Sequence, residues 1–139
     1  MPAGQWYPPE TRAFMDAETG ATIEQLTDHP SIHHHPFYYL PACDDAMRHL
    51  VVVSHRTGRA EVYTLEWDSG RLLRLTDQPD IAEWSVHTSH NGRYVYYTAG
   101  SGAWRVSTDT IVAEQLVDFG DASMRERGMV GGRPWAPRP

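Results

Sequence analysis

Short runs of apolar and β-branched residues recur along the chain, and each run ends at a glycine or an acidic turn. His49 to Ser54 is β-branched, and Ala60 to Trp67 alternates apolar with polar side chains. This alternation predicts strands with one buried face, and the turn at Arg56 to Arg59 joins them as an antiparallel hairpin. Arg71 to Thr76 extends the pattern, and Ser31 to Leu40 can supply one further strand before it.

A second group of runs follows the same plan. Strands are predicted at Glu83 to His87, Arg93 to Thr98, Ala103 to Ser107 and Ile111 to Val117. Between the first two stands Ser89-His90-Asn91-Gly92, whose Asn-Gly pair is a strong hairpin signal. Four consecutive antiparallel strands are typical of a propeller blade, so the pattern predicts two blades.

One phrase occurs twice and supports this interpretation. Residues 16–28 read DAETGATIEQLTD and residues 68–77 read DSGRLLRLTD, each with an acidic turn, a glycine, a β-rich run and Leu-Thr-Asp. The two endings start at Leu26 and Leu75, 49 residues apart, and a degraded third ending at Gln115 to Asp118 follows 41 residues later. Self-similarity at a period in the forties is typical of propeller blades.

The predicted fold is therefore all-β, a β-propeller fragment of the WD40 or TolB-like kind with about two four-stranded blades. We expect an N-terminal segment at 1–28 whose strand at Ala21 to Leu26 closes a ring, blade 1 at 29–77, blade 2 at 78–118, and an irregular or disordered tail at 119–139. Two blades cannot close a ring of four to eight. We therefore expect either a fragment of a longer protein or a piece that depends on assembly.

The composition of the chain limits the classes of partner and the compartment that we expect. The net charge of −6 argues against a nucleic-acid coat, and no apolar run approaches the ~18 residues of a membrane span. The N-terminus lacks a signal-peptide pattern, and the single Cys43 fits a reducing compartment, so we expect a cytoplasmic protein. All twelve basic residues are arginine. This composition reflects either a GC-rich genome or the use of guanidinium groups that bind carboxylates in a bidentate manner.

Histidines form the main candidate site. His33, His34 and His35 are consecutive, and on a strand the first and third share a face that could bind an anion or a metal. The alternative is a structural cluster at a loop-to-strand junction. No Asp, Glu or Cys stands at a spacing that completes a metal site, so no metal ligand is predicted. His55 and Arg56 lie at a strand end where they can reach a ligand, and no nucleophile motif is present.

From Ile23 to Tyr63 the sequence resembles the opening of an oligogalacturonate lyase, a seven-bladed propeller related to the TolB type. The resemblance extends over about residues 10–118. The residues that carry it are Asp16, Thr19, Gly20, Leu26-Thr27-Asp28, His33-His34-His35, Phe37, Ser54, Arg56, Gly58 and Tyr63.

The resemblance implies β-elimination of uronate-containing oligosaccharides from pectin. A base removes the proton next to the uronate carboxylate, and a divalent metal, manganese in this family, stabilises the resulting charge. The family's metal ligands lie in later blades, so neither a base nor a metal ligand is assigned here. We predict that the acidic oligosaccharide contacts His33, His34, His35, Arg56 and His87.

Two other functions stay open at this point. The chain could be a non-catalytic TolB-like propeller module that binds a protein or a glycan, or a translated remnant without function. Formation of an unsaturated uronate from digalacturonate would distinguish the lyase from the binding module.

Overall fold

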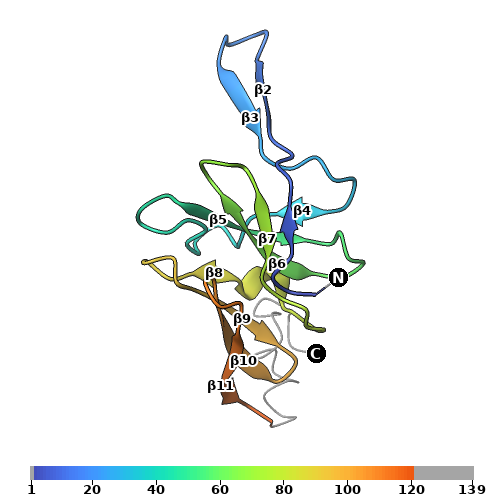
Figure 1. The fold of residues 1–139 in the computed structure, drawn as a ribbon, viewed down its shortest axis with the longest axis vertical. Helices are drawn as coiled ribbons and strands as arrows, with labels where there is room; N and C mark the ends of the chain where they lie inside the picture. Colours follow the sequence, from blue (N-terminus) through green and yellow to red (C-terminus); the bar gives the residue numbers. More distant parts are fainter. Residues whose placement is uncertain (1, 121–139) are drawn as a thin grey trace, which may run out of the picture.

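The computed structural model describes residues 2–120, and within them nearly all regular structure is antiparallel sheet (Figure 1). The first sheet has the order β1-β7-β6-β5-β4, the second β11-β10-β9-β8, and β2 pairs with β3 alone. The elements are β1 (Trp6–Tyr7), β2 (Arg12–Met15), β3 (Thr22–Gln25), β4 (His33–His34), β5 (His49–Ser54), β6 (Glu61–Glu66), β7 (Leu72–Arg74), the 3-10 helix η1 (Glu83–Ser85), β8 (His87–Thr88), β9 (Tyr94–Ala99), β10 (Gly102–Ser107) and β11 (Ala113–Asp118).

The two predicted four-stranded sheets are confirmed, and we call β4 to β7 blade 1 and β8 to β11 blade 2. The β5–β6 hairpin pairs Leu50 with Leu65 and Val53 with Val62, as the turn at Gly58 requires. Successive strands of each blade are neighbours, so β4 and β8 occupy equivalent ends of the two sheets. In a propeller the blades surround a central channel, and the first strand of each blade lines it.

One core joins the two blades. Val51, Val53 and Val62 of blade 1 pack in the same buried cluster as Val95 and Val106 of blade 2. These residues follow the period-two pattern of their strands, because alternate side chains point to the same face of a sheet. A smaller cluster on the other face of blade 1 contains Tyr63, Leu65 and Leu72, covered by Tyr7, Leu26 and Leu50.

Two predicted strands are shorter than expected. In the segment Glu83 to His87, a strand was expected throughout, but η1 occupies Glu83–Ser85 and only His87 extends into β8. The Ser85 hydroxyl and backbone N–H both donate to the Ala82 carbonyl, at 2.6 and 2.9 Å, which favours a local turn over a strand. In the other segment only His33–His34 forms a strand, and Pro36 follows, which has no N–H to donate.

The N-terminal segment differs from the prediction in one respect. β1 adds to the outer edge of blade 1 by pairing with β7, which the sequence pattern did not indicate. The strand expected to close a ring is β3, which pairs with β2 in a hairpin that projects from one end of the molecule (Figure 1). Ring closure by β3 stays a prediction. The predicted tail lies outside the described residues from position 121 onward.

The repeated Leu-Thr-Asp phrase has a physical cause that involves the residue before it. The Arg74 side chain donates to the Thr76 carbonyl at 2.7 Å and to the Asp77 carboxylate at 2.8 Å. In the other copy Gln25 Nε2 donates to the Thr27 carbonyl at 2.8 Å and to Asp28 at 2.9 Å. In both copies a side-chain donor folds forward and fixes the end of its strand.

The turns that precede these strands also share one geometry. The fifth residue of each turn has a left-handed φ, 72° at Gly20, 70° at Gly70 and 59° at Ile111. Its N–H donates to the carbonyl four residues earlier, at 2.9 Å to Asp16, 2.8 Å to Glu66 and 3.0 Å to Ser107. The third turn keeps this shape although an isoleucine replaces the glycine that such a φ favours. The degraded third copy is therefore a structural repeat.

Candidate functional site

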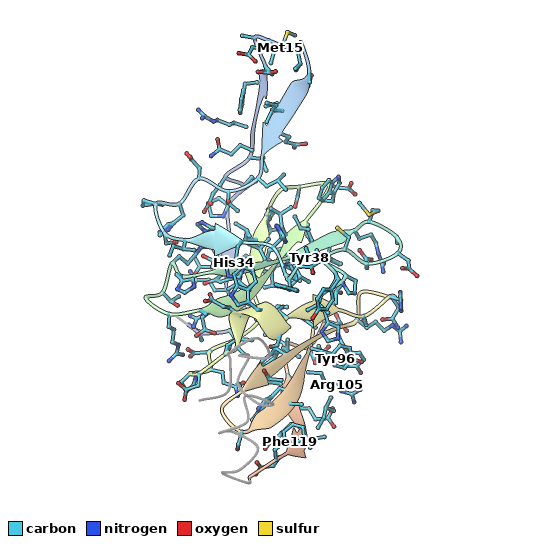
Figure 2. All side chains as sticks on the ribbon, turned by 180° about the vertical axis from the view of Figure 1, so that it is seen from behind. Met15, His34, Tyr38, Tyr96, Arg105 and Phe119 are labelled. Carbon is cyan, nitrogen blue, oxygen red and sulfur yellow. The ribbon has the colours of Figure 1, made fainter. Side chains whose placement is uncertain are left out.

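Two histidines and a glutamate from three separate segments meet beside β4. The antiparallel register places His33 opposite Ser54 and His34 opposite Val53, so the residue after β5, His55, lies next to the start of β4. Glu83 reaches the same place from η1, in the connection between the two blades. Figure 2 shows His34 and Tyr38 in the middle part of the molecule, between the β2–β3 hairpin, with Met15 at its tip, and blade 2. We call His34, His55 and Glu83 the histidine–glutamate cluster.

The geometry of the cluster is tight. Glu83 Oε2 lies 3.1 Å from His34 Nε2 and 2.7 Å from His55 Nε2. The three candidate ligand atoms all lie within 4.8 Å of one another. The side chains are partly accessible, with 16% of His34, 29% of His55 and 33% of Glu83 exposed. A small ligand or ion can therefore reach the cluster from solvent.

The proton positions are constrained on one histidine. His34 Nδ1 lies 2.8 Å from the His35 carbonyl oxygen, which can only accept, so Nδ1 carries a hydrogen. His34 Nε2 faces the Glu83 carboxylate at 3.1 Å. Burial raises the pKa of Glu83, but hydrogen bonds from His55 and His34 outweigh it, and the pKa lies below its ordinary value. Glu83 is thus an anion that faces two imidazole nitrogens.

Aromatic side chains border the cluster. The Trp84 ring stacks on the His34 imidazole with centroids 4.3 Å apart, and Phe37 meets Trp84 edge-on at 6.1 Å. Tyr38 is 80% exposed, Tyr39 59% and Trp84 45%. We call Phe37, Tyr38, Tyr39 and Trp84 the aromatic flank. The sequence analysis named only the histidine run and Phe37 here.

Two predicted contact residues, Arg56 and the half-buried His33, are engaged with each other. Arg56 is 4% exposed, and its guanidinium lies 2.8 Å from Glu10, 3.1 Å from His33 Nε2 and over the rings of Tyr7 and Tyr63 at 4.8 and 5.3 Å. Because a guanidinium only donates, His33 Nε2 must accept and His33 is neutral. Burial and the Arg56 charge lower the pKa of His33 in agreement. Both residues fasten the N-terminal segment to blade 1.

The other two predicted contact residues are closer to solvent. His35 is exposed, and its Nδ1 hydrogen-bonds the Pro36 carbonyl. His87 stands on β8, where its ring stacks on Tyr96 at 5.3 Å and its Nδ1 donates to the Ser85 carbonyl at 3.2 Å. The fold thus brings His34 and His35 to the start of blade 1, and His87 to the corresponding strand of blade 2.

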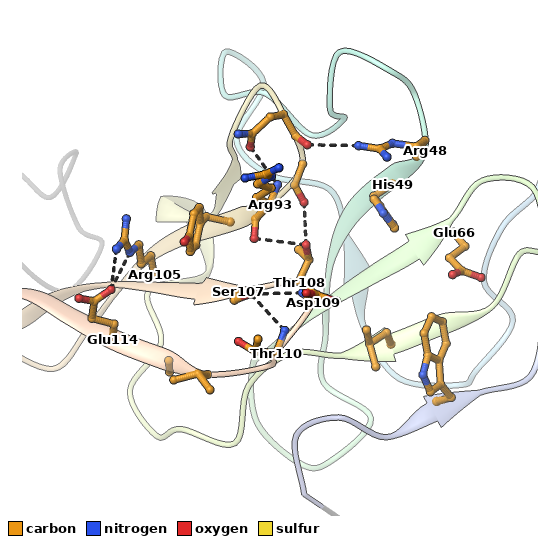
Figure 3. Close-up of a pocket in the computed structure, with 17 residues that line it drawn as sticks. Arg48, His49, Glu66, Arg93, Arg105, Ser107, Thr108, Asp109, Thr110 and Glu114 are labelled. Atoms are coloured by element: carbon orange, nitrogen blue, oxygen red, sulfur yellow. Dashed lines mark hydrogen bonds and ion pairs between the residues drawn. The ribbon is translucent and has the colours of Figure 1, made fainter.

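A separate cleft of about 1060 Å³ opens between the two blades, lined by their outer strands and turns (Figure 3). Two of the arginines that line it form ion pairs, Arg48 with Asp44 at 3.3 Å and Arg105 with Glu114 at 2.7 Å. None of the predicted contact residues lines it. The cleft is larger than the histidine–glutamate cluster, and among the residues that line it His49 supplies one imidazole (Figure 3).

Comparison with known proteins identifies the fold. No protein-family model matches the chain. A structure of an oligogalacturonate lyase in complex with manganese is similar over 85% of the chain, with a TM-score of 0.79 and 20% identity. An oligogalacturonate lyase from Vibrio parahaemolyticus is similar over 81%, with a TM-score of 0.76 and 18% identity. The chain has the fold of part of an oligogalacturonate lyase.

This similarity confirms the predicted propeller. The chain spans about a third of the two lyase structures, 32% and 30% of their lengths. A TolB from Acinetobacter baumannii is similar over 75% of the chain and 26% of its own length, at 15% identity and a TM-score of 0.47, too distant to argue from. No helix among the described residues is long and apolar enough to cross a membrane.

Within the cluster, the sequence gives no signal for Glu83 and indicates His55 only as a strand-end residue that can reach a ligand. His55 could have been placed beside His33 and His34, because the predicted strands share a hairpin register. Glu83 carried no local signal, since it lies 49 residues from His34 and reaches it only because η1 interrupts the strand expected there. The prediction of no metal ligand depended on that missing carboxylate.

Proposed function

We propose that this chain forms part of the substrate-binding face of a lyase-like propeller that cleaves uronate-containing oligosaccharides by β-elimination. The similarity of the fold to two oligogalacturonate lyases supports this proposal. The observation that carries the proposal is the juxtaposition of exposed aromatic rings, Tyr38 and Trp84, with imidazoles at the first strand of blade 1. Sugars and their carboxylates need both kinds of group.

The chemistry of an acidic sugar fits this arrangement. The apolar face of a sugar ring packs on an exposed aromatic ring, while a uronate carboxylate accepts hydrogen bonds from imidazole or imidazolium N–H groups. In this proposal Trp84 and Tyr38 hold sugar rings, His35 and His87 face carboxylates or hydroxyls, and His34 supports the Trp84 ring by stacking on it. Arg56 and His33 act as positioning residues, because their polar groups are already engaged with Glu10 and with each other.

β-Elimination needs a base and a stabilised carbanion. The base takes the proton from the carbon next to the carboxylate, the electron pair forms a double bond to the neighbouring carbon, and the glycosidic oxygen leaves with the other sugar. Positive groups near the carboxylate lower the energy of the intermediate. A bound divalent cation would supply such charge, as manganese accompanies one of the similar lyases. The residues of this chain bind and orient the acidic sugar.

Binding by the chain itself tests the proposal. We expect trigalacturonate to bind and neutral maltotriose not to bind in isothermal titration calorimetry. Trp84→Ala should weaken binding about tenfold, the equivalent of about 1.4 kcal/mol of ring contact. Trp67→Ala is the matched control, since Trp67 is 43% exposed on a turn after β6, away from the cluster. Equal losses from both variants would refute the site.

Turnover distinguishes the lyase from the binding module. We expect the 139-residue chain alone to give no unsaturated uronate absorbance from digalacturonate with Mn²⁺, because the family's metal ligands lie in later blades. A longer protein that contains this chain and those blades should give it. Binding without turnover by that longer protein would favour the non-catalytic module.

A further inference from the structure

We propose that the histidine–glutamate cluster is a binding site for a divalent transition-metal ion, with His34 Nε2, His55 Nε2 and Glu83 Oε2 as its ligands. The distances that carry this inference are 3.1 Å and 2.7 Å from the carboxylate oxygen to the two nitrogens. The inference is independent of the lyase proposal, because it concerns metal binding by three residues of this chain and is tested without substrate.

The first argument is the convergence of three candidate ligand atoms from separate segments of the chain. His34 Nδ1 is engaged with the His35 carbonyl oxygen at 2.8 Å, which leaves Nε2 as the nitrogen that can bind an ion. This nitrogen and His55 Nε2 both face the same Glu83 oxygen, at 3.1 and 2.7 Å, and the three atoms lie within 4.8 Å of one another. An ion placed between them is within reach of all three.

The second argument is the donor set. Two imidazole nitrogens and one carboxylate oxygen are the ligands of catalytic zinc sites, and the same set binds other first-row divalent ions. Tetrahedral zinc with bonds of about 2.0–2.1 Å holds its ligand atoms about 3.3 Å apart. The carboxylate oxygen therefore lies a few tenths of an ångström too close to each nitrogen, and the two nitrogens, which lie within 4.8 Å of each other, have to settle at the same spacing when the ion binds. At least one coordination position would then remain for water or a carboxylate oxygen.

The third argument is the support behind the ligands. His34 is oriented by its Nδ1 hydrogen bond and by stacking on Trp84 at 4.3 Å. A hydrogen bond from the non-ligating nitrogen to a carbonyl is the usual way in which proteins orient a metal-binding histidine. Glu83 sits in a turn fixed by the Ser85 bonds to the Ala82 carbonyl. Two of the three ligands are thus held in place without the ion.

Metal titration of the purified chain tests the site. With Zn²⁺ in isothermal titration calorimetry we expect one ion per chain, and with Co²⁺ we expect visible absorption bands typical of low-coordinate cobalt. His55→Ala and Glu83→Gln should each weaken binding by more than about 100-fold, since even residues behind a ligand cost 10–100-fold. His90→Ala is the matched control, because His90 pairs with Asp45 at 3.3 Å on an exposed turn outside the cluster.

Each result of the metal titration either supports or overturns the metal site. One-to-one binding that is lost in both cluster variants and kept in His90→Ala supports the site, provided that circular dichroism shows the variants folded. The absence of stoichiometric binding, or binding unchanged by His55→Ala and Glu83→Gln, overturns it. Loss of oligosaccharide binding with metal binding intact would leave this site standing while the proposed function fails.

Discussion

The buried ion pair between Glu61 and Arg74 offers the sharpest test of how blade 1 is held together. Glu61 is fully buried and Arg74 is 2% exposed, and their side chains meet at 3.2 Å. The perturbation is Arg74→Met, which removes the charge and keeps much of the volume. It leaves the Glu61 carboxylate buried with fewer partners, and it also removes the donor that fixes Thr76 and Asp77.

The magnitude follows from burial. Breaking one partner from a buried ion pair costs about 3–5 kcal/mol, because the remaining charge cannot recover its hydration. The other arginine on Glu61 provides the control, since Arg59 bonds the same carboxylate at 2.7 Å but is 44% exposed. Because the Arg59 guanidinium is largely solvated, water screens its attraction to Glu61, and we expect the pair to contribute close to the ~0–1 kcal/mol of a surface pair. Arg74→Met should therefore cost several times more unfolding free energy than Arg59→Met.

The assay is urea denaturation followed by tryptophan fluorescence for the wild type, Arg59→Met, Arg74→Met, Glu61→Leu and the double variant Glu61→Leu/Arg74→Met. The double variant removes both charges, so we expect it to be more stable than Arg74→Met, by about 2 kcal/mol or more. Costs for Arg74→Met no larger than those for Arg59→Met would refute the reasoning. So would a double variant whose loss is the sum of the single losses.

Two further predictions concern a turn and a carboxylate. Gly70→Ala should lower the urea midpoint more than Gly58→Ala, because both have a positive φ but a Cβ on Gly70 would lie 2.8 Å from the Thr11 methyl carbon and one on Gly58 meets nothing within 4 Å. Equal midpoints would contradict this. Burial raises the pKa of Asp44, but backbone hydrogen bonds from His49 and Arg48 lower it more, to below the ordinary 3.8. The stability from this group is present above pH 3.8 and is lost as pH falls through the lower folded value, so Asp44→Asn should flatten acid denaturation in that window.

The sequence predicted the fold well where one strand face is buried. His49–Ser54 is the strand expected, because β-branched residues and a glycine turn fix both its type and its partner. The repeat also predicted equivalent turns, and Ile111 shows that the geometry persists where the glycine is lost. Local pattern failed at Glu83, where a serine bond to the backbone made a turn instead of a strand.

The candidate site was only partly predictable, for a related reason. A run of three histidines is visible in the sequence, but the charges that meet them are not. Arg56 was expected to face substrate, whereas Glu10, 46 residues away, engages its guanidinium. The residue types indicate the chemistry of the site. Contacts with residues far away in the sequence decide which of these side chains remain free to bind a ligand. Substrate contact by the five predicted residues stays a prediction.

The shared core has a consequence for how this array comes apart. Val51, Val53 and Val62 are buried by Val95, Tyr97 and Val106 of the neighbouring sheet, so the sequence repeat and the cooperative unit do not coincide. We expect the unit that unfolds cooperatively to be this junction, to which each blade contributes part of the buried residues. Cutting the gene at a module boundary would split this junction and expose its buried valines to water on both products.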